Sequence, residues 1–192
     1  MIAIFFLLAC VQSVSGRSHC ELNSTKGCWG HLKTFAERIG TANPFNTIDV
    51  GYRSAPTFTD LDNDGDFDLV VGESDGNIKY YENTGNSTYA NFTERFSTAN
   101  PFNTIDVGYY STPTFTDLDN DGDFDLVVGE DGGTINYYEN TGSVTNPVYT
   151  ERTENPFNTI DVRSYSTPTF VDLDNDGDLD LAVGGDTINY YE

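Results

Sequence analysis

Residues 60–72 read DLDNDGDFDLVVG, and nearly the same stretch recurs at residues 117–129 and 172–184. In each copy a run of alternating aspartates leads into a short apolar segment. The segment NPFNTIDV precedes every copy, beginning at Asn43, Asn100 and Asn155. Self-similarity at a nearly fixed period is the signature of a repeat architecture. The sequence therefore predicts three structural repeats, which together occupy residues 34–192.

Within the first repeat, short β-forming segments alternate with turn residues. The predicted strands are Pro56–Thr59, Phe67–Glu73, Ile78–Glu82 and Phe92–Phe96, and SDGN at 74–77 forms a hairpin turn in which glycine supplies the positive φ. Four antiparallel strands in a unit of ~55 residues are typical of a propeller blade. We therefore expect an all-β fold, a β-propeller-like array of three four-stranded blades.

The two ends of the array are out of phase. The third copy stops after its third predicted strand, whereas Phe35–Arg38 matches the fourth strand of the first copy, Phe92–Arg95. Propellers usually have about 4–8 blades, more than the three predicted here. Three explanations remain open: the chain is a fragment of a longer propeller, it assembles with another copy, or it forms an open array.

The acidic loops at 60–68, 117–125 and 172–180 have the pattern D-x-D-x-D-G-D-x-D. Alternate carboxylates in a tight turn face one hollow, where a hard cation accepts oxygen ligands. We predict four side-chain ligands in each loop: Asp60, Asp62, Asp64 and Asp68; Asp117, Asp119, Asp121 and Asp125; Asp172, Asp174, Asp176 and Asp180. A backbone carbonyl completes each set, at Asp66, Asp123 and Asp178. About one Ca²⁺ per repeat is expected.

Alternatives to a calcium loop are weaker. An EF-hand needs a glutamate at its twelfth position and helices on both sides, but that position is Val71, Val128 or Val183 inside an apolar segment. Mg²⁺ prefers strict octahedral geometry and keeps its waters, and the repeats hold no His or Cys for a transition metal. The remaining alternative is that the aspartates only solvate a turn. Because the same acidic pattern occurs at the same position of all three repeats, this alternative is weak.

These motifs carry a family resemblance. The run PTFTDLDNDGDFDLVVG from Pro56 to Gly72, with DGNIKYYENTG from Asp75 to Gly85, resembles FG-GAP/VCBS repeats. Such repeats form the blades of integrin α-subunit N-terminal propellers and of many secreted proteins. The resemblance implies a propeller-like fold and a Ca²⁺ ion that stiffens each blade. It also implies an interaction or adhesion module that recognises an extracellular protein or glycan.

The first residues have the features of an exported protein. An uncharged apolar run at 2–11, followed by small residues, predicts a signal peptide at 1–16, although a buried N-terminal strand is the alternative. A leader at 17–33 follows, in which Cys20 and Cys28 form a predicted disulfide; two free thiols are the alternative. Glycosylation sequons begin at Asn23, Asn86 and Asn91. We expect a secreted protein without a transmembrane segment in its mature chain.

Charge and residue types exclude several function classes. The net charge of −22 and the sequence pI of about 4.1 disfavour nucleic acids as partners, because phosphate would be repelled. Aromatic residues make up 14% of the sequence, which excludes a disordered acidic tail. The two histidines lie outside the repeats and no nucleophile motif is present, so we expect no enzyme; a paired-carboxylate hydrolase is the least favoured function. Self-association remains an alternative. So does carbohydrate binding through the tyrosine pair of each repeat, but burial of these tyrosines between blades is favoured. The pairs are Tyr80–Tyr81, Tyr137–Tyr138 and Tyr190–Tyr191.

Overall fold

The computed structural model describes residues 9–12, 18–21 and 35–192, and it divides the chain into the units Met1–Ala42 and Asn43–Glu192. In the first unit, strands β1 (Ala9–Gln12) and β2 (Ser18–Glu21) form an antiparallel pair, and a short 3₁₀ turn, η1, spans Gly40–Ala42. The predicted signal peptide and leader lie largely outside the described residues. Residues 35–38 have no regular structure, contrary to the predicted strand; an unpaired strand has no ladder to stabilise it.

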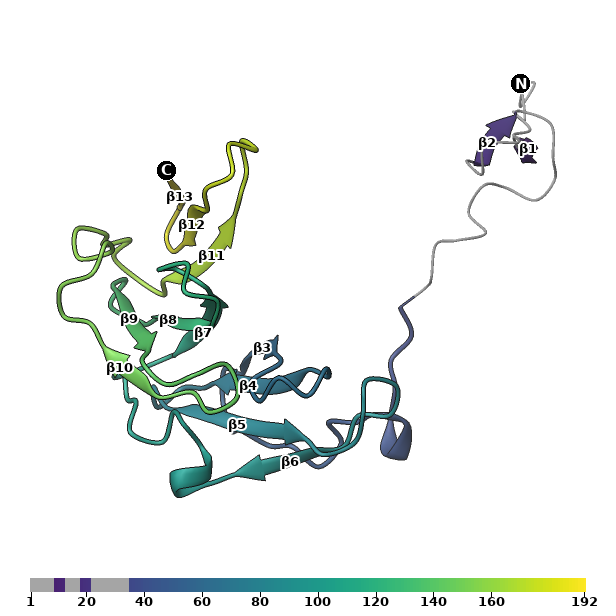
Figure 1. The fold of residues 1–192 in the computed structure, drawn as a ribbon, viewed down its shortest axis with the longest axis horizontal. Helices are drawn as coiled ribbons and strands as arrows, with labels where there is room; N and C mark the ends of the chain where they lie inside the picture. The colour runs from purple at the N-terminus through teal and green to yellow at the C-terminus, as the bar shows by residue number, and fades with distance from the viewer. Residues whose placement is uncertain (1–8, 13–17, 22–34) are drawn as a thin grey trace, which may run out of the picture. The chain divides into compact units, whose positions relative to one another are not determined.

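The second unit consists of three antiparallel sheets, one from each repeat (Figure 1). The first sheet contains β3 (Ala55–Thr59), β4 (Asp68–Gly72), β5 (Ile78–Asn83) and β6 (Phe92–Arg95). A 3₁₀ turn, η2 (Ser97–Ala99), leads to the second sheet, made of β7 (Thr112–Thr116), β8 (Asp125–Gly129), β9 (Ile135–Asn140) and β10 (Tyr149–Glu151). The third contains β11 (Thr167–Val171), β12 (Asp180–Gly184) and β13 (Ile188–Tyr191).

This architecture confirms the all-β, blade-like prediction. Each strand in a sheet follows its neighbour in sequence, so every sheet is a simple meander. The first two sheets have four strands and the third has three, as the phase of the repeats indicated. Among the described residues, no helix is long and apolar enough to cross a membrane.

The central strands bury both of their faces. In the first sheet, Val70 lies opposite Tyr80 on one face, and Leu69 lies opposite Tyr81 on the other. All four side chains are buried, because successive residues of a strand point to opposite faces and each face is covered. The second sheet repeats the arrangement with its own tyrosine pair, also buried. Core packing of these pairs is therefore confirmed in the first two repeats.

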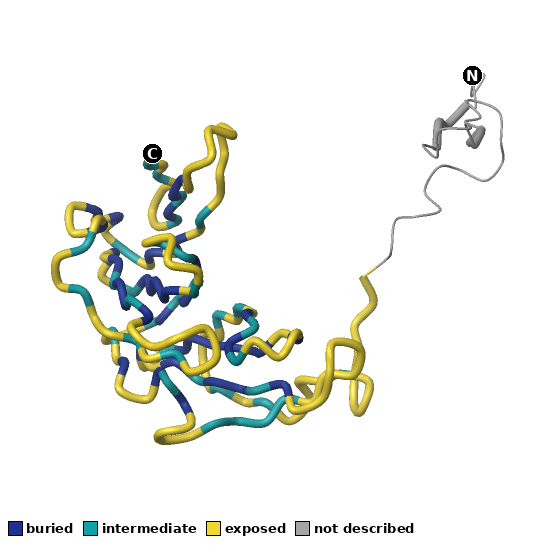
Figure 2. Tube along the Cα trace, in the orientation of Figure 1, coloured by how far each residue is buried: buried dark blue, intermediate teal, exposed yellow. Residues whose placement is uncertain are grey.

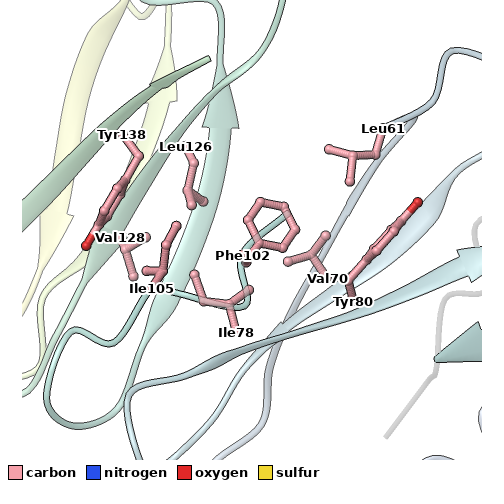
Figure 3. Packing of buried hydrophobic residues seen from close by; sticks show 9 residues of the cluster. All are labelled: Leu61, Val70, Ile78, Tyr80, Phe102, Ile105, Leu126, Val128 and Tyr138. Atoms are coloured by element: carbon pink, nitrogen blue, oxygen red, sulfur yellow. The ribbon is translucent and has the colours of Figure 1, made fainter. Parts of the chain in front are cut away.

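Apolar layers fill the space between neighbouring sheets. The first layer contains Phe102, which lies between Val70 and Tyr80 of one sheet and Leu126 of the next (Figure 3). Phe102 comes from the second NPFNTIDV segment, and Phe157 of the third copy occupies the same place in the next layer. This phenylalanine is thus buried between sheets in two copies, whereas Phe45 of the first copy is partly exposed.

The sheets also approach each other through backbone. Strand β7 packs beside both β3 and β11. A Cβ added at Gly129 would overlap the backbone carbonyl of Ser166, so only glycine permits this approach. Ser166 fixes the contact: its N–H donates to the Glu130 carbonyl at 3.0 Å, and its hydroxyl donates to the Thr134 carbonyl at 2.6 Å. Gly72 and Ser111 make the equivalent contact between the first two sheets.

Candidate metal centres

The three acidic loops occupy one position in the fold. Each joins the first strand of a sheet to the second, between β3 and β4, β7 and β8, and β11 and β12. The ladder closes immediately beside the loop: Thr59 pairs with Asp68 in the first sheet, and Thr116 pairs with Asp125 in the second. The loops are therefore hairpin connections held at both ends by a sheet.

Backbone geometry turns the aspartates of each loop inward. Asn63 and Gly65 have φ angles of 59° and 94°, in the left-handed region, and the same two positions are left-handed in the other loops. Asn and Gly are the residues that adopt this conformation at least cost. The Asp60 carboxylate accepts hydrogen bonds from the N–H groups of Asp64 and Gly65, at 3.1 and 3.0 Å, which closes the turn.

Three carboxylates of each loop come together as a result. One oxygen from each lies within 4.8 Å of the others in three sets: Asp60, Asp62 and Asp64; Asp117, Asp119 and Asp121; Asp172, Asp174 and Asp176. Burial and the nearby charge of Asp64 raise the pKa of Asp62 above its usual range. The three carboxylates of each set are partly or fully exposed and lie close enough together to hold one metal ion between them.

Two further carboxylates support this interpretation. The Oδ1 atoms of Asp66 and Asp123 are buried and have no hydrogen-bond partner in the described structure. Burial raises the pKa of both groups, with the neighbouring aspartates adding to the effect. An unpaired buried oxygen is costly unless a proton or a cation satisfies it. The all-oxygen donor set fits a hard cation.

The last aspartate of each loop has a different environment from the one predicted. Asp68 is buried, and its Oδ2 accepts hydrogen bonds from the Leu61 N–H at 3.1 Å and the Tyr80 hydroxyl at 3.0 Å. Its Oδ1 accepts from the Asn83 N–H at 2.7 Å. Asp125 makes the equivalent three contacts, and Asp180 accepts from the Leu173 N–H. The clusters of close carboxylates do not include Asp68, Asp125 or Asp180, whose role as ligands stays a prediction.

Sequence reasoning had missed this buried network. Burial raises the pKa of Asp68 to about 6 even though three donors lower it, so desolvation outweighs the hydrogen bonds. Asn83 extends the network, because its side-chain oxygen accepts from the N–H groups of Gly85 and Asn91. The signal was the repetition of YYENTG after each of the first two loops, which sets Tyr80 and Asn83 at fixed distances from Asp68.

A family model matches the chain over most of this region. The FG-GAP-like repeat matches twice, at residues 60–128 and 117–183, and the two matches together span more than half of the sequence. The chain belongs to the FG-GAP-like repeat family. Each match begins at an acidic loop and ends in the second strand of the following sheet, so it includes one complete layer between sheets. No curated protein matches the chain, and no solved structure matches it.

A bidentate ion pair lies beside the acidic loop in two of these FG-GAP-like repeats. Arg95 on β6 donates to both oxygens of Glu82 on β5, at 2.8 and 2.5 Å, and Arg152 pairs with Glu139 in the same way. The Arg152 guanidinium holds the pKa of Glu139 below its usual range. The ion pair joins the third and fourth strands of a sheet and was not predicted from the sequence.

The remaining predicted sites of this FG-GAP-like chain lie at the surface or beyond the described residues. Asn86 and Asn91 lie in the exposed connection from β5 to β6. The Asn91 amide donates to the Thr84 hydroxyl at 2.9 Å. The predicted acceptor Asn23 and the predicted disulfide partner Cys28 lie outside the described residues, whereas Cys20 lies on β2. The glycosylation and disulfide predictions therefore stay predictions.

Proposed function

We propose that this protein is a secreted, calcium-binding interaction module, in which Ca²⁺ stabilises each blade. The observation that carries the proposal is the same carboxylate cluster at the same hairpin of all three FG-GAP-like repeats. Ca²⁺ accepts six to eight oxygen ligands in flexible geometry, which suits loops built from side chains and backbone alone. The ion would offset the mutual repulsion of the carboxylates and couple folding to its own binding.

Calcium titration of the purified chain tests this function. We expect isothermal calorimetry and native mass spectrometry to give three Ca²⁺ per chain, and EDTA to lower the melting temperature. Asp62→Asn, Asp119→Asn and Asp174→Asn should each remove one ion, because each removes a charge from one cluster. Asp75→Asn is the matched control, since Asp75 lies in the hairpin turn between β4 and β5, outside the clusters. Unchanged stoichiometry in the three variants would refute the assignment.

Export is part of the same proposal. The apolar run at 2–11 and the sequons at Asn86 and Asn91 support a protein that passes through a secretory pathway. The expected mature protein begins near residue 17, carries glycan at exposed asparagines and performs no catalysis. Expression of the full chain in a eukaryotic secretory host, with N-terminal sequencing of the medium product, tests the cleavage. A product that stays inside the cell with Met1 intact would contradict it.

Carbohydrate binding has support at a different place from the tyrosine pairs. An aromatic cluster, defined as Arg53, Tyr109, Tyr110 and Tyr165, lies in the loops before the first strands of the sheets. The Arg53 guanidinium lies 4.0 Å from the centre of the Tyr110 ring, and the Tyr110 and Tyr165 rings lie 5.5 Å apart. Arg53, Tyr110 and Tyr165 all have positive φ, a strained conformation that is more frequent at functional sites.

The exposed rings of this aromatic cluster favour a sugar as a second candidate ligand. Tyr109 and Tyr165 keep large exposed areas. An exposed ring can stack on the apolar face of a pyranose while the phenol and guanidinium donate hydrogen bonds. Binding to a glycan array in calcium-containing buffer, lost in Tyr165→Ala and kept in Tyr89→Ala, would support this function. Tyr89 is also exposed, at 78% against 48% for Tyr165, but lies outside the cluster. A silent array, or equal binding by both variants, would refute it.

A further inference from the structure

The chain builds the same interface between neighbouring sheets twice. We call the side that the earlier sheet contributes to an interface its donor side. In the first interface this side contains Val70, Ile78 and Tyr80 of the first sheet, with Leu61 from the acidic loop (Figure 3). On the receiving side lie the second NPFNTIDV segment and the facing residues of the second sheet, Leu126, Val128 and Tyr138. The next interface uses the corresponding residues one repeat later: Val127, Ile135 and Tyr137 against Phe157, Ile160, Leu181 and Val183.

The third sheet presents this same donor face, but to solvent. Ile188 corresponds to Ile78 and Ile135, which are 3% and 5% exposed, yet Ile188 is 83% exposed. Tyr190, the counterpart of buried Tyr80, is 43% exposed, and Leu173, the counterpart of Leu61, is 65% exposed. Figure 2 shows the exposed backbone around β13, in contrast with the buried strands of the middle sheet. We call Leu173, Ile188 and Tyr190 the donor face.

The first sheet presents the receiving half of the interface. Phe45 of the first NPFNTIDV segment is 38% exposed, whereas its counterpart Phe102 is fully buried. Phe45, Ile48, Val50, Pro56, Phe58 and Val71 line an open apolar hollow of about 360 Å³ on this side of the sheet. We call this set the receiving face. It contains the residue types that cover a donor face at both internal interfaces.

The serine and glycine that make the backbone contact at each internal interface also have equivalents in the first and third sheets, which make no such contact within the described part of the chain. Ser111 and Ser166 each hydrogen-bond to the preceding sheet, while their counterpart Ser54 is exposed. Gly72 and Gly129 each receive a serine carbonyl of the next sheet, while a Cβ added at Gly184 would meet only Thr167 of its own sheet. The hairpin after Gly184 is two residues shorter than that after Gly129, and it retains the strand pair β12–β13.

We propose that the receiving face of one copy packs on the donor face of a second copy, and that this contact closes reciprocally into a two-fold dimer of six blades. Because both faces already fit each other inside the chain, the occupant is specified as another copy of the same chain. The contact is heterologous, so it either closes into a ring or propagates. Six blades fall within the usual range of about 4–8 for a closed propeller, which favours closure at two copies.

The mass of the full chain in solution tests the dimer, by light scattering in calcium and in moderate salt. The wild type should have twice the mass of one chain. Ile188→Lys and Phe45→Glu should each be monomeric, because each places a charge in an apolar interface. An equimolar mixture of the two variants should recover the dimer, since one interface then regains the wild-type pair and the other gains a lysine–glutamate pair. Tyr89→Glu should stay dimeric, because Tyr89 is nearly as exposed as Ile188 but lies outside both faces.

A second variant separates loss of the interface from loss of the fold. In Gly184→Ala the added methyl would overlap the Thr167 hydroxyl, a side-chain end that can rotate away. The variant should therefore keep the far-ultraviolet spectrum of the chain, and it should raise the dimer dissociation constant at least tenfold, because the methyl blocks the approach of Ser54 from the second copy. A monomeric wild type at high concentration would overturn the proposal. So would a series of larger species, or a dimer that survives in either single variant, Ile188→Lys alone or Phe45→Glu alone.

Discussion

The close approach of neighbouring sheets gives a prediction whose size follows from the structure. In Gly129→Ala the new methyl would overlap the Ser166 carbonyl and lie 2.6 Å from the Thr112 hydroxyl. A backbone carbonyl cannot rotate out of the way as the end of a side chain can. The third sheet must therefore move away from the second. This movement stretches two hydrogen bonds: Ser166 N–H to the Glu130 carbonyl at 3.0 Å, and the Thr112 hydroxyl to the Ser166 carbonyl at 2.7 Å.

The expected cost combines these effects. Each weakened hydrogen bond contributes about 0.5–1.5 kcal/mol to the free energy of unfolding. Overpacking of a tight contact costs a further ~1–3 kcal/mol. The sum of about 2–6 kcal/mol corresponds to a fall in melting temperature of at least about 4 °C, at roughly 2–4 °C per kcal/mol for a domain of this size.

Thermal and urea unfolding in excess Ca²⁺, at one fixed protein concentration, measures the effect. Gly132→Ala is the matched control, because it lies in the same hairpin and its added methyl would meet only the flexible Glu130 carboxylate, at 3.0 Å. We expect the control to cost less than about 1 kcal/mol. Equal losses in the two variants would show that the contact between Gly129 and Ser166 does not limit how the sheets pack.

Three further predictions concern the polar groups of the blades. Tyr80→Phe should lower the free energy of unfolding by about 1.5–3 kcal/mol, because it removes a hydrogen-bond donor from the buried Asp68 carboxylate. The control Tyr81→Phe should change this free energy by less than about 0.5 kcal/mol. Equal effects of the two variants would contradict the role of the Tyr80 hydroxyl. In EDTA, the free energy of unfolding should fall as pH rises from about 4 to 7, because burial raises the pKa of Asp68 from its ordinary value of 3.8 to about 6 and the native state therefore binds more protons. Asp68→Asn should flatten this slope in pH-dependent melting. Arg152→Gln should lower the free energy of unfolding only slightly, because the pair with Glu139 is exposed to water and salt. The Arg152 guanidinium lowers the pKa of Glu139, so this contribution is present above about pH 4.5 and lost in stronger acid. A large cost that salt does not reduce would refute the assignment.

Much of the fold followed from local sequence signals. The strands of the first repeat were located within one or two residues, because alternation, turn glycines and the acidic loops mark their ends. Burial of Tyr80 followed from the two-residue period of a strand, whose two faces are both covered. These are short-range features, and each occurs in all three repeats of the sequence.

The missed features depend on contacts between distant residues. Alternation in the acidic loop could not show that Asp64 faces the cluster while Asp68 faces Tyr80, since both lie on alternate positions of one turn. The contact of Ser111 with the Asn77 carbonyl joins two sheets, and the stacking of Arg53 on Tyr110 joins two repeats. Such pairs become visible only when the sheets are placed beside each other.

The middle sheet is the only described sheet with a neighbour on both faces, and this has a consequence for how the chain unfolds. In an array of nearly identical units, stability is the sum of unit terms and nearest-neighbour terms, so opening begins at the ends. In the monomeric Ile188→Lys variant, amide hydrogens of β8 should therefore exchange last, and those of β12 and β13 first. The same additivity means that a whole repeat is a unit of inheritance: its duplication adds one blade and one matching interface without disturbing the others.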